Sequence, residues 1–222
     1  MLSWATSGVA SPDERLVWRA DLDPRALPSA AVTSSQRAIL SACVELFADQ
    51  GYAATSVRDI AGLVGIKAAS LYKSFPSKQA ILDTLSELGH TEFSSRQLAA
   101  VLAAGESPSA QLAAGVRALV RTTCAFPRLT RVVNNEVRNL SGPGFERDQA
   151  ARWHTAQILR DVVDRGEASG EFLVPDVAAL TVMFWGVVLA LSGWYPYAPD
   201  ADADALADSY ADMALRVVGA RV

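Results

Sequence analysis

The sequence predicts an all-α protein with a small N-terminal three-helix unit of the helix-turn-helix type and a larger C-terminal helical bundle. Apolar residues recur at intervals of three and four along most of the 222 residues, which is typical of helices that bury one face. Alternation of apolar and polar residues is never sustained, so no strand is expected. Half of the residues are apolar, which is enough for a buried core.

Composition divides the chain into three regions. Residues 1–32 form an N-terminal extension interrupted by three prolines, and we expect it to be partly disordered with a short helix only over 12–20. Residues 33–82 carry the helix-turn-helix pattern, and residues 83–222 carry the helical bundle.

The first helix of the 33–82 region is expected to begin near Thr33. Thr33 and Gln36 have the spacing of a capping box, in which each side chain binds a backbone N–H of the other residue. Gly51 is expected to end the helix. Its apolar stripe consists of Ile39, Cys43, Leu46 and Phe47.

Two short helices follow, joined by a tight turn. Thr55 or Ser56 is expected to cap the first of them, and Gly65 permits the turn into the second, which spans residues 67 to about 74. Two short helices joined at a glycine behind a longer support helix form the helix-turn-helix pattern.

The last helix of this region is expected to start after Pro76, with Ser77 as its cap. The inward positions of the three later helices are Val57, Ile60, Ala61 and Val64, then Leu71, then Ile81, Leu82, Leu85 and Leu88.

Positive charge is concentrated in this region of an acidic chain. The formal net charge is −4, yet all three lysines, Lys67, Lys73 and Lys78, lie within twelve residues. Residues 33–82 carry five basic and three acidic side chains, whereas residues 83–222 carry 12 arginines and 17 acids. Such an offset is expected of a module that binds phosphate groups, although a solvated surface patch gives the same count.

The expected helix over 67–74 exposes small, polar and basic side chains away from Leu71. Small residues let a helix approach base edges in a major groove, while Lys, Tyr and Ser side chains reach phosphates. These candidates are Lys67, Ala68, Ala69, Ser70, Tyr72 and Lys73. The pattern favours an interface with double-stranded DNA; alternatively, Tyr72 packs on the first helix and Lys73 is a solvated charge.

Residues 37–82 resemble the DNA-binding region of TetR/AcrR-type transcriptional regulators over a long stretch without gaps. The matching positions are Arg37, Ile39, Leu40, Ala42, Leu46, Phe47, Gly51, Tyr52, Thr55, Ser56, Val57, Ile60, Ala61, Gly65, Ile66, Ser70, Leu71, Tyr72, Phe75, Ser77, Lys78 and Leu82. Two positions depart from the family pattern, because Val64 replaces the usual Ala and Ser74 replaces the usual His or Tyr. The second departure removes a frequent phosphate contact of that family.

The resemblance implies a cytoplasmic homodimer that regulates transcription, most simply a repressor released from its operator by a small-molecule effector. Carried over by position, Thr55, Tyr72 and Lys78 are the implied phosphate anchors. The implied groove-facing positions are Arg58, Lys67, Ala68, Ala69, Ser70 and Lys73. The helix end capped by Ser77 can itself approach a phosphate.

Capping residues and helix breakers place the helices of the 83–222 region. One helix is expected to start at Ser107–Pro108, and another after Phe126–Pro127 that includes residues 134–138. The residues 142–144, Gly-Pro-Gly, are expected to break the chain. The remaining expected helices span about 145–168, 176–194 and 202–218, with Gly170 and a turn over 195–199 between them.

Three short segments of this region, 135–140, 158–176 and 194–196, loosely resemble a subgroup that controls fatty-acid or steroid catabolism. Some members of that subgroup respond to acyl-CoA thioesters, so the resemblance implies a small apolar or acyl-CoA-like effector. The candidate ligand-binding residues are Phe126, Asn135, Glu136, Arg138, Trp153, Phe184, Trp185 and Trp194. Aromatic residues at helical spacing are also typical of a plain core.

Residues 177–199 contain no charged residue. A membrane span and a core or dimer-interface helix are both compatible with such a segment. Glycines and prolines shorten the apolar run, and the flanking residues Asp176 and Asp200 are acidic, whereas membrane spans are usually flanked by Lys or Arg. Both observations favour a core or dimer-interface helix over a membrane span, so no membrane is expected as a partner. With the apolar face of the last helix, two chains would form a four-helix interface.

The sequence contains little that favours catalysis, metal binding or a cofactor. His90 and His154, the only histidines, sit in no recognisable motif, and no nucleophile elbow or phosphate-binding loop is present. With Cys43 and Cys124 they cannot form a short-spaced zinc site. The alternative function is a helical enzyme, or an acyl-ligand-binding protein that does not bind DNA.

Overall fold

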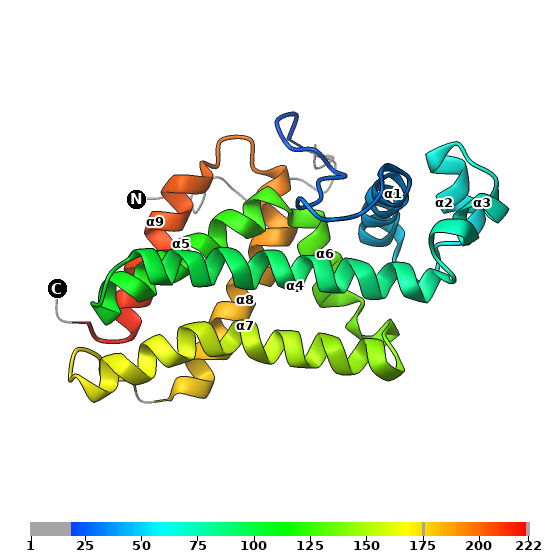
Figure 1. The fold of residues 1–222 in the computed structure, drawn as a ribbon. Helices are drawn as coiled ribbons and strands as arrows, with labels where there is room; N and C mark the ends of the chain where they lie inside the picture. The colour runs from blue at the N-terminus through cyan, green and yellow to red at the C-terminus, as the bar shows by residue number, and fades with distance from the viewer. Residues whose placement is uncertain (1–18, 175, 221–222) are drawn as a thin grey trace.

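The computed structural model describes residues 19–174 and 176–220, and this part of the chain is built from helices without a strand (Figure 1). This confirms the all-α prediction. The helices are α1 (Ser34–Gln50), α2 (Val57–Val64), α3 (Ala68–Ser74), α4 (Lys78–Ala103), α5 (Pro108–Ala125), α6 (Pro127–Asn135), α7 (Gly142–Ala168), α8 (Val177–Trp194) and α9 (Ala203–Val217), with 3₁₀ turns η2 (Val137–Asn139) and η3 (Tyr195–Tyr197).

Short polar side chains start most of these helices where the sequence predicts them. Thr33 and Gln36 form the expected capping box of α1, and Ser56 rather than Thr55 caps α2. Each cap accepts a backbone N–H that the first turn of a helix leaves without a partner. The other side-chain caps are Ser77, Ser107, Asp176 and Asp202.

Two expected boundaries are wrong. Gly142–Pro143–Gly144 does not break the chain but forms the first turn of α7, because a proline in the first turn lacks only an N–H that would stay unbonded there. The helix expected to include residues 134–138 ends at Asn135, and a 3₁₀ turn follows over Val137–Asn139.

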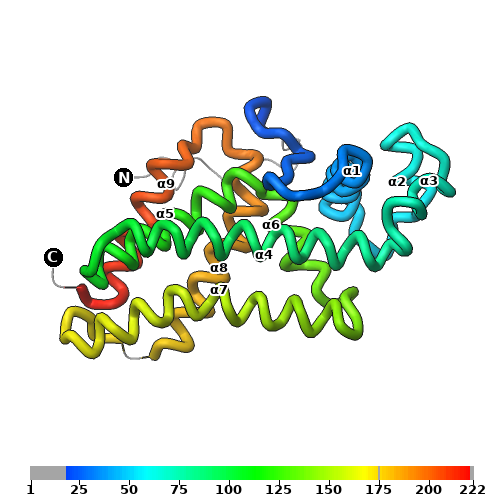
Figure 2. Tube along the Cα trace, viewed as in Figure 1, coloured from blue at the N-terminus to red at the C-terminus, as the bar shows by residue number. Residues whose placement is uncertain are grey.

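The tube in Figure 2 shows how α4 connects the two ends of the molecule. Helices α1, α2 and α3 lie around its first turns, and we call these three helices the head. Helices α5 to α9 lie around its remainder, and we call them the body. Because α4 is one helix from Lys78 to Ala103, it passes through the boundary expected near residue 82 without a break.

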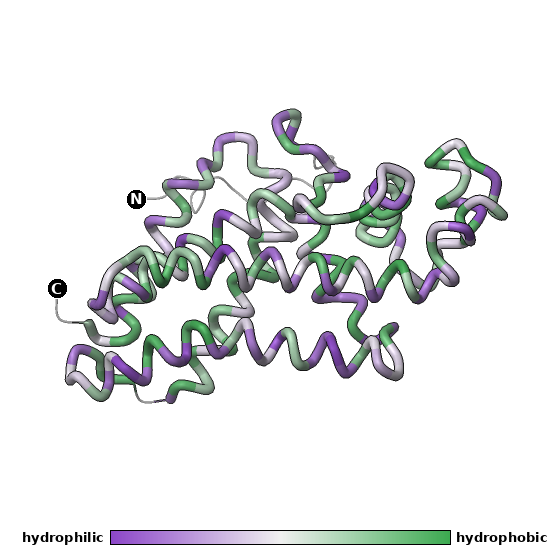
Figure 3. Tube along the Cα trace, in the orientation of Figure 1, coloured by the Kyte–Doolittle hydropathy of each residue, from purple (hydrophilic) through white to green (hydrophobic). Residues whose placement is uncertain are grey.

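The head shares its core with the body. Ile39, Ile60 and Leu71 belong to the same buried cluster as Leu129 and Val132 of α6. A second cluster fills the body between α5, α7, α8 and α9. In Figure 3 hydrophilic and hydrophobic stretches alternate along α4 and α7, as expected of helices that bury one face.

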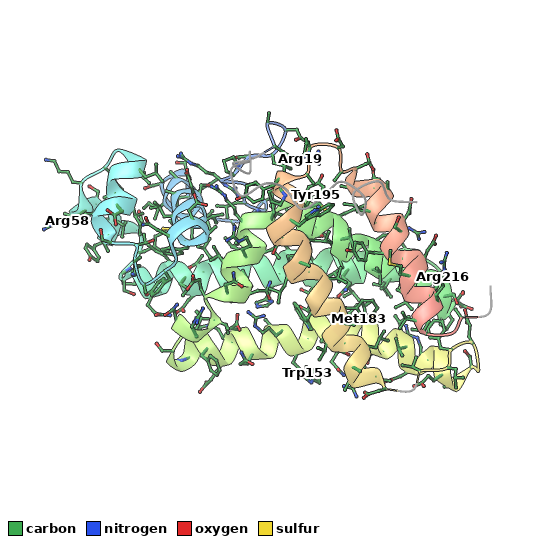
Figure 4. All side chains as sticks on the ribbon, turned by 180° about the vertical axis from the view of Figure 1, so that it is seen from behind. Arg19, Arg58, Trp153, Met183, Tyr195 and Arg216 are labelled. Atoms are coloured by element: carbon green, nitrogen blue, oxygen red, sulfur yellow. The ribbon has the colours of Figure 1, made fainter. Side chains whose placement is uncertain are left out.

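The described part of the N-terminal extension contacts both the body and the head. The Arg19 guanidinium donates to the carbonyls of Ala198 and Ala201 and lies 4.7 Å from the ring centre of Tyr195, as Figure 4 shows from behind. At the head, Arg37 donates to the carbonyl of Pro28 over 2.9 Å. Arg19 is therefore held by the body. Most of the helix expected over 12–20, and all of residues 1–18, lie outside the described residues.

Candidate nucleic-acid interface and ligand cavity

Helices α2 and α3 present one polar face at the end of the head. Their inner positions Ile60, Ala61 and Leu71 are at most 3% exposed and fix both helices on α1. Gly65 adopts a φ of 76°, a left-handed conformation that lets the chain reverse between them. The packing therefore determines which side chains of α2 and α3 face outward.

The outward side chains include three cations at the end of the molecule. Arg58, Lys67 and Lys73 are exposed, and in the described part of the chain no carboxylate forms an ion pair with them. In Figure 4 the Arg58 side chain extends away from all other elements. Tyr72 is 53% exposed beside them. Because these cations form no ion pair among the described residues, they can bind phosphate groups beside the Tyr72 hydroxyl without first breaking an internal contact.

The small residues of α3 lie on the same face. Ala69 is exposed, and Ala68 and Ser70 are half-buried. Alanine and serine side chains are short, so the α3 backbone could approach a groove floor closely here.

Thr55 and Lys78 are engaged inside the head. Thr55 is 1% exposed, and its hydroxyl donates to the Gly51 carbonyl over 2.8 Å. The Lys78 ammonium donates to the carbonyls of Tyr52 and Thr55 over 2.7 and 2.8 Å and lies 4.0 Å from the centre of the Tyr52 ring. Both side chains thus hold the α1–α2 connection in shape. For Lys78 this internal role was missed because it joins residues more than twenty positions apart.

Ser74, which departs from the family pattern, makes contacts within the head. Its hydroxyl lies 3.3 Å from that of Ser35, and its carbonyl accepts a long hydrogen bond of 3.5 Å from Gln36. The residue therefore joins the end of α3 to the start of α1.

A polar network joins α4 to α7 behind the head. The carboxylate of Asp148 is buried and accepts hydrogen bonds from Ser86 and Arg152 over 2.7 Å, while His90 Nε2 lies 3.0 Å away. Burial acts to raise the pKa of the Asp148 carboxyl, but the hydrogen bonds from His90, Arg152 and Ser86 outweigh it and hold that pKa well below its ordinary value of 3.8. Arg152 also donates to Asn134 of α6 over 2.9 Å, so the network ties three helices together.

The body contains an apolar cavity between α4, α5, α7 and α8. Its free volume is about 30 Å³, which is room for about one water molecule. The lining residues are Gln97, Leu119, Thr155, Ala156, Leu159, Arg160, Val163, Val177, Leu180, Thr181, Phe184, Trp185 and Val188.

Of the eight ligand-binding candidates, the structure brings Phe184 and Trp185 to this cavity. Trp153 is 66% exposed on α7, and Trp194 is 39% exposed at the end of α8. Phe126 packs against the core shared by head and body, where Arg96 lies over its ring. The structure also keeps Asn135, Glu136 and Arg138 away from the cavity, at the junction between α6 and η2.

Sequence reasoning missed the polar residues that line this cavity. Gln97 lies on α4, and Thr155 and Arg160 lie on α7. A signal for Gln97 is present, because it follows the inward positions of α4 at helical spacing although it is polar. No comparable signal marks Arg160, which is exposed at the edge of the cavity.

Helix α8 buries one face and exposes the other. Leu180, Phe184, Val188 and Leu191 face the core. In the described part of the chain, Val177–Tyr197 is the one stretch long and apolar enough to cross a membrane, and 28% of its most apolar window is buried. The exposed face carries Val182, Met183, Leu189 and Trp194, and in Figure 4 α8 lies in front of the other body helices. We call these four exposed residues of α8 the strip. Because the opposite face of α8 is buried in the core, a further partner of this helix would contact the strip.

Two family profiles match the chain. The profile described as "Bacterial regulatory proteins, tetR family" matches residues 39–85, which include α2 and α3. The profile described as "Tetracyclin repressor-like, C-terminal domain" matches residues 105–218, more than half of the chain.

Characterised proteins and solved structures resemble the chain as well. It is 27% identical over 135 residues to the HTH-type transcriptional repressor KstR2 of Rhodococcus jostii (strain RHA1), an alignment that covers 60% of this chain and 66%, less than two thirds, of that relative. A bacterial regulatory protein of the tetR family from Rhodococcus RHA1 is 27% identical with a TM-score of 0.78, covering 86% of this chain and 100% of that one. AibR, solved with isovaleryl coenzyme A and operator DNA, shares the fold at 23% identity and a TM-score of 0.72, over 84% and 99% of the two chains.

Proposed function

The chain belongs to the TetR family of bacterial regulatory proteins, and from this we propose that it is a transcriptional repressor that binds an operator in double-stranded DNA as a homodimer. The observation that carries the proposal is the exposed face of α2 and α3, where Arg58, Lys67 and Lys73 have no internal carboxylate partner in the described ranges. The site of action is the cytoplasm, where bacterial DNA lies.

On duplex DNA, α3 would lie in the major groove. Lys67 and Lys73 stand near the two ends of α3, so they can reach phosphates on either side of the groove while Ala69 and Ser70 face base edges. Tyr72 would add a phosphate contact through its hydroxyl. Lys78 has two of its N–H groups occupied by carbonyls, so it contributes mainly by holding α2 in place.

A second copy of the chain would cover the exposed strip of α8. That strip contains no charged side chain, and the neighbouring Met213 and Val217 of α9 are also exposed. An isologous contact between two such faces buries apolar surface on both chains and sets a fixed distance between the two heads.

Val182→Glu is expected to convert the dimer into a monomer at micromolar concentration. Val182 is 71% exposed in the single chain, so the monomer tolerates the change, whereas the dimer would bury two unpaired carboxylates at a cost of several kcal/mol. Light scattering after gel filtration measures the mass. Leu102→Glu is the matched control, because Leu102 is 72% exposed on α4 and lies outside the strip. A wild-type monomer, or a Val182→Glu dimer, would contradict the assignment.

A small, mainly apolar effector would occupy the cavity beside Phe184 and Trp185. The cavity has room for about one water in this form, so binding must separate α7 from α8. An acyl thioester is a reasonable class, because AibR was solved with isovaleryl coenzyme A and the exposed guanidinium of Arg160 at the cavity edge could pair with an anionic end of the ligand. The ligand would release DNA only to the extent that it binds the widened form more tightly than the closed one.

Selection of genomic DNA tests the proposal directly. Fragments of the source genome are incubated with the purified dimer at moderate salt, and the retained fragments are sequenced. Enrichment of a few sites that contain a pseudo-palindrome supports a repressor. Equal recovery of all fragments, or none, would favour the alternative of an acyl-ligand-binding protein or enzyme without DNA binding.

A further inference from the structure

Gln97 is a buried polar residue whose side-chain oxygen has no partner among the described residues. The residue is 2% exposed, and within the described ranges its Oε1 accepts no hydrogen bond. Leaving a buried amide unpaired is unfavourable, so such groups in proteins usually have a water, an ion or a ligand as partner.

Among the described residues, the walls of the cavity offer Gln97 Oε1 no hydrogen-bond donor. The remaining inner wall of the cavity is largely aliphatic and aromatic. Its two threonines have already used their hydroxyl protons, since Thr155 donates to the Ala151 carbonyl over 2.9 Å and Thr181 donates to the Val177 carbonyl over 2.9 Å. Gln97 is thus the buried amide of a largely apolar cavity.

Gln97 lies where α4, α5 and α7 pack closely against one another. A Cβ placed on Gly115 of α5 would lie 3.8 Å from Gln97 Cγ and 2.5 Å from a methyl of Leu159. The absent side chain at residue 115 therefore lets α5 approach α4 and α7 closely, and the stem of Gln97 lies between them. Gln97 thus lines the cavity at a place where three helices meet.

We propose that Gln97 determines which ligands this cavity accepts, and that it selects molecules with an apolar body and one uncharged hydrogen-bonding group. The amide offers an acceptor and a donor side by side, which a hydroxyl or a secondary amide of the ligand can satisfy together. A charged group at this depth is disfavoured, because it would lose its hydration without gaining an opposite charge. The inference rests on the proposed function only in taking the cavity as the effector site.

Pairs of isomeric probes test the inference. 1-Octanol and heptyl methyl ether have the same atoms, but the ether lacks the O–H donor. N-Hexylacetamide and N-methyl-N-pentylacetamide form the corresponding pair for an amide N–H. The dissociation constant of each probe is measured by calorimetry on the full-length dimer.

The wild-type protein is expected to bind the donor-bearing isomer of at least one pair about five- to tenfold more tightly, which corresponds to one additional hydrogen bond. The pair that shows the preference distinguishes a hydroxyl-bearing from an amide-bearing ligand. Gln97→Leu is expected to reduce the preference to less than about twofold and to melt at the same or a higher temperature, because it removes a buried unpaired amide. Gln97→Met takes its place if the leucine variant does not fold.

Gln111→Leu is the matched control outside the cavity. Gln111 lies on α5 and its amide already donates to the Gly105 carbonyl, so its replacement is expected to leave the preference unchanged. The inference is overturned if wild type binds both isomers equally, as it would when a resident water satisfies Gln97, if the leucine variant keeps the preference, or if no probe binds. DNA binding of the same preparations separates the two proposals. If the wild-type protein binds DNA but does not distinguish the isomeric probes, this inference alone is overturned.

Discussion

Replacing Lys67 and Lys73 together by alanine is expected to weaken binding to duplex DNA by about 10²- to 10³-fold at about 0.1 M salt. Each lysine that contacts a phosphate releases a bound counterion, and two protomers double the number of contacts. The slope of log affinity against log salt should therefore become shallower by about three to four units. The fold should be unaffected, because both side chains are exposed and form no ion pair in the described residues.

Fluorescence anisotropy with a labelled duplex measures both quantities across a series of salt concentrations. Arg165→Ala is the control, because Arg165 lies near the end of α7, at the opposite end of the molecule from α3 (Figure 1). It removes one positive charge per chain, where the double variant removes two, and should leave the slope unchanged. An equal effect of the control, or an unchanged slope in the double variant, would show that α3 does not contact the phosphates.

Asp148→Ala is expected to lower the free energy of unfolding by about 3 to 5 kcal/mol, because the largely buried guanidinium of Arg152 loses the carboxylate with which it pairs. His90 and Ser86 lose the same partner. The free energy of unfolding from urea titration measures the loss. Asp164→Ala on the same helix is the control, because Asp164 is exposed and should change stability little. A loss below about 1 kcal/mol would show that solvent satisfies the network.

The effect of Asp148 should also depend on pH in a defined direction. Its pKa in the folded protein lies below the ordinary value of 3.8, so the carboxylate binds protons less readily than in the unfolded chain. Its stabilising contribution is therefore complete above about pH 5 and is lost as the pH falls below about 4 towards the folded-state pKa. Measured against Asp148→Asn, the stability difference should stay constant from neutral pH down to about 5 and shrink in stronger acid.

The helices could be predicted because their signals are local. Thr33, Ser77, Asp176 and Asp202 cap helices at the expected positions, and a cap acts within one turn of its own residue. The failure at Gly142–Pro143–Gly144 is local as well, because the same three residues can end one helix or begin the next.

The cavity could be predicted only in part because its walls come from four helices. Helical spacing indicates which residues share a face, but it does not say which helix covers that face. Phe184 and Trp153 both look like cavity residues in the sequence, yet Phe184 is buried in the core of the body, whereas Trp153 is 66% exposed in the described part of the chain. The internal bonds of Lys78 escaped prediction for the same reason.

The most direct test of the account is the affinity of the wild-type dimer for duplex DNA as a function of salt. We expect micromolar or tighter binding to any duplex at about 50 mM salt, much tighter binding to the selected genomic sites, and a loss of affinity of about 10³-fold or more by about 200 mM. A folded dimer that binds no duplex even at the lowest salt concentration would contradict it.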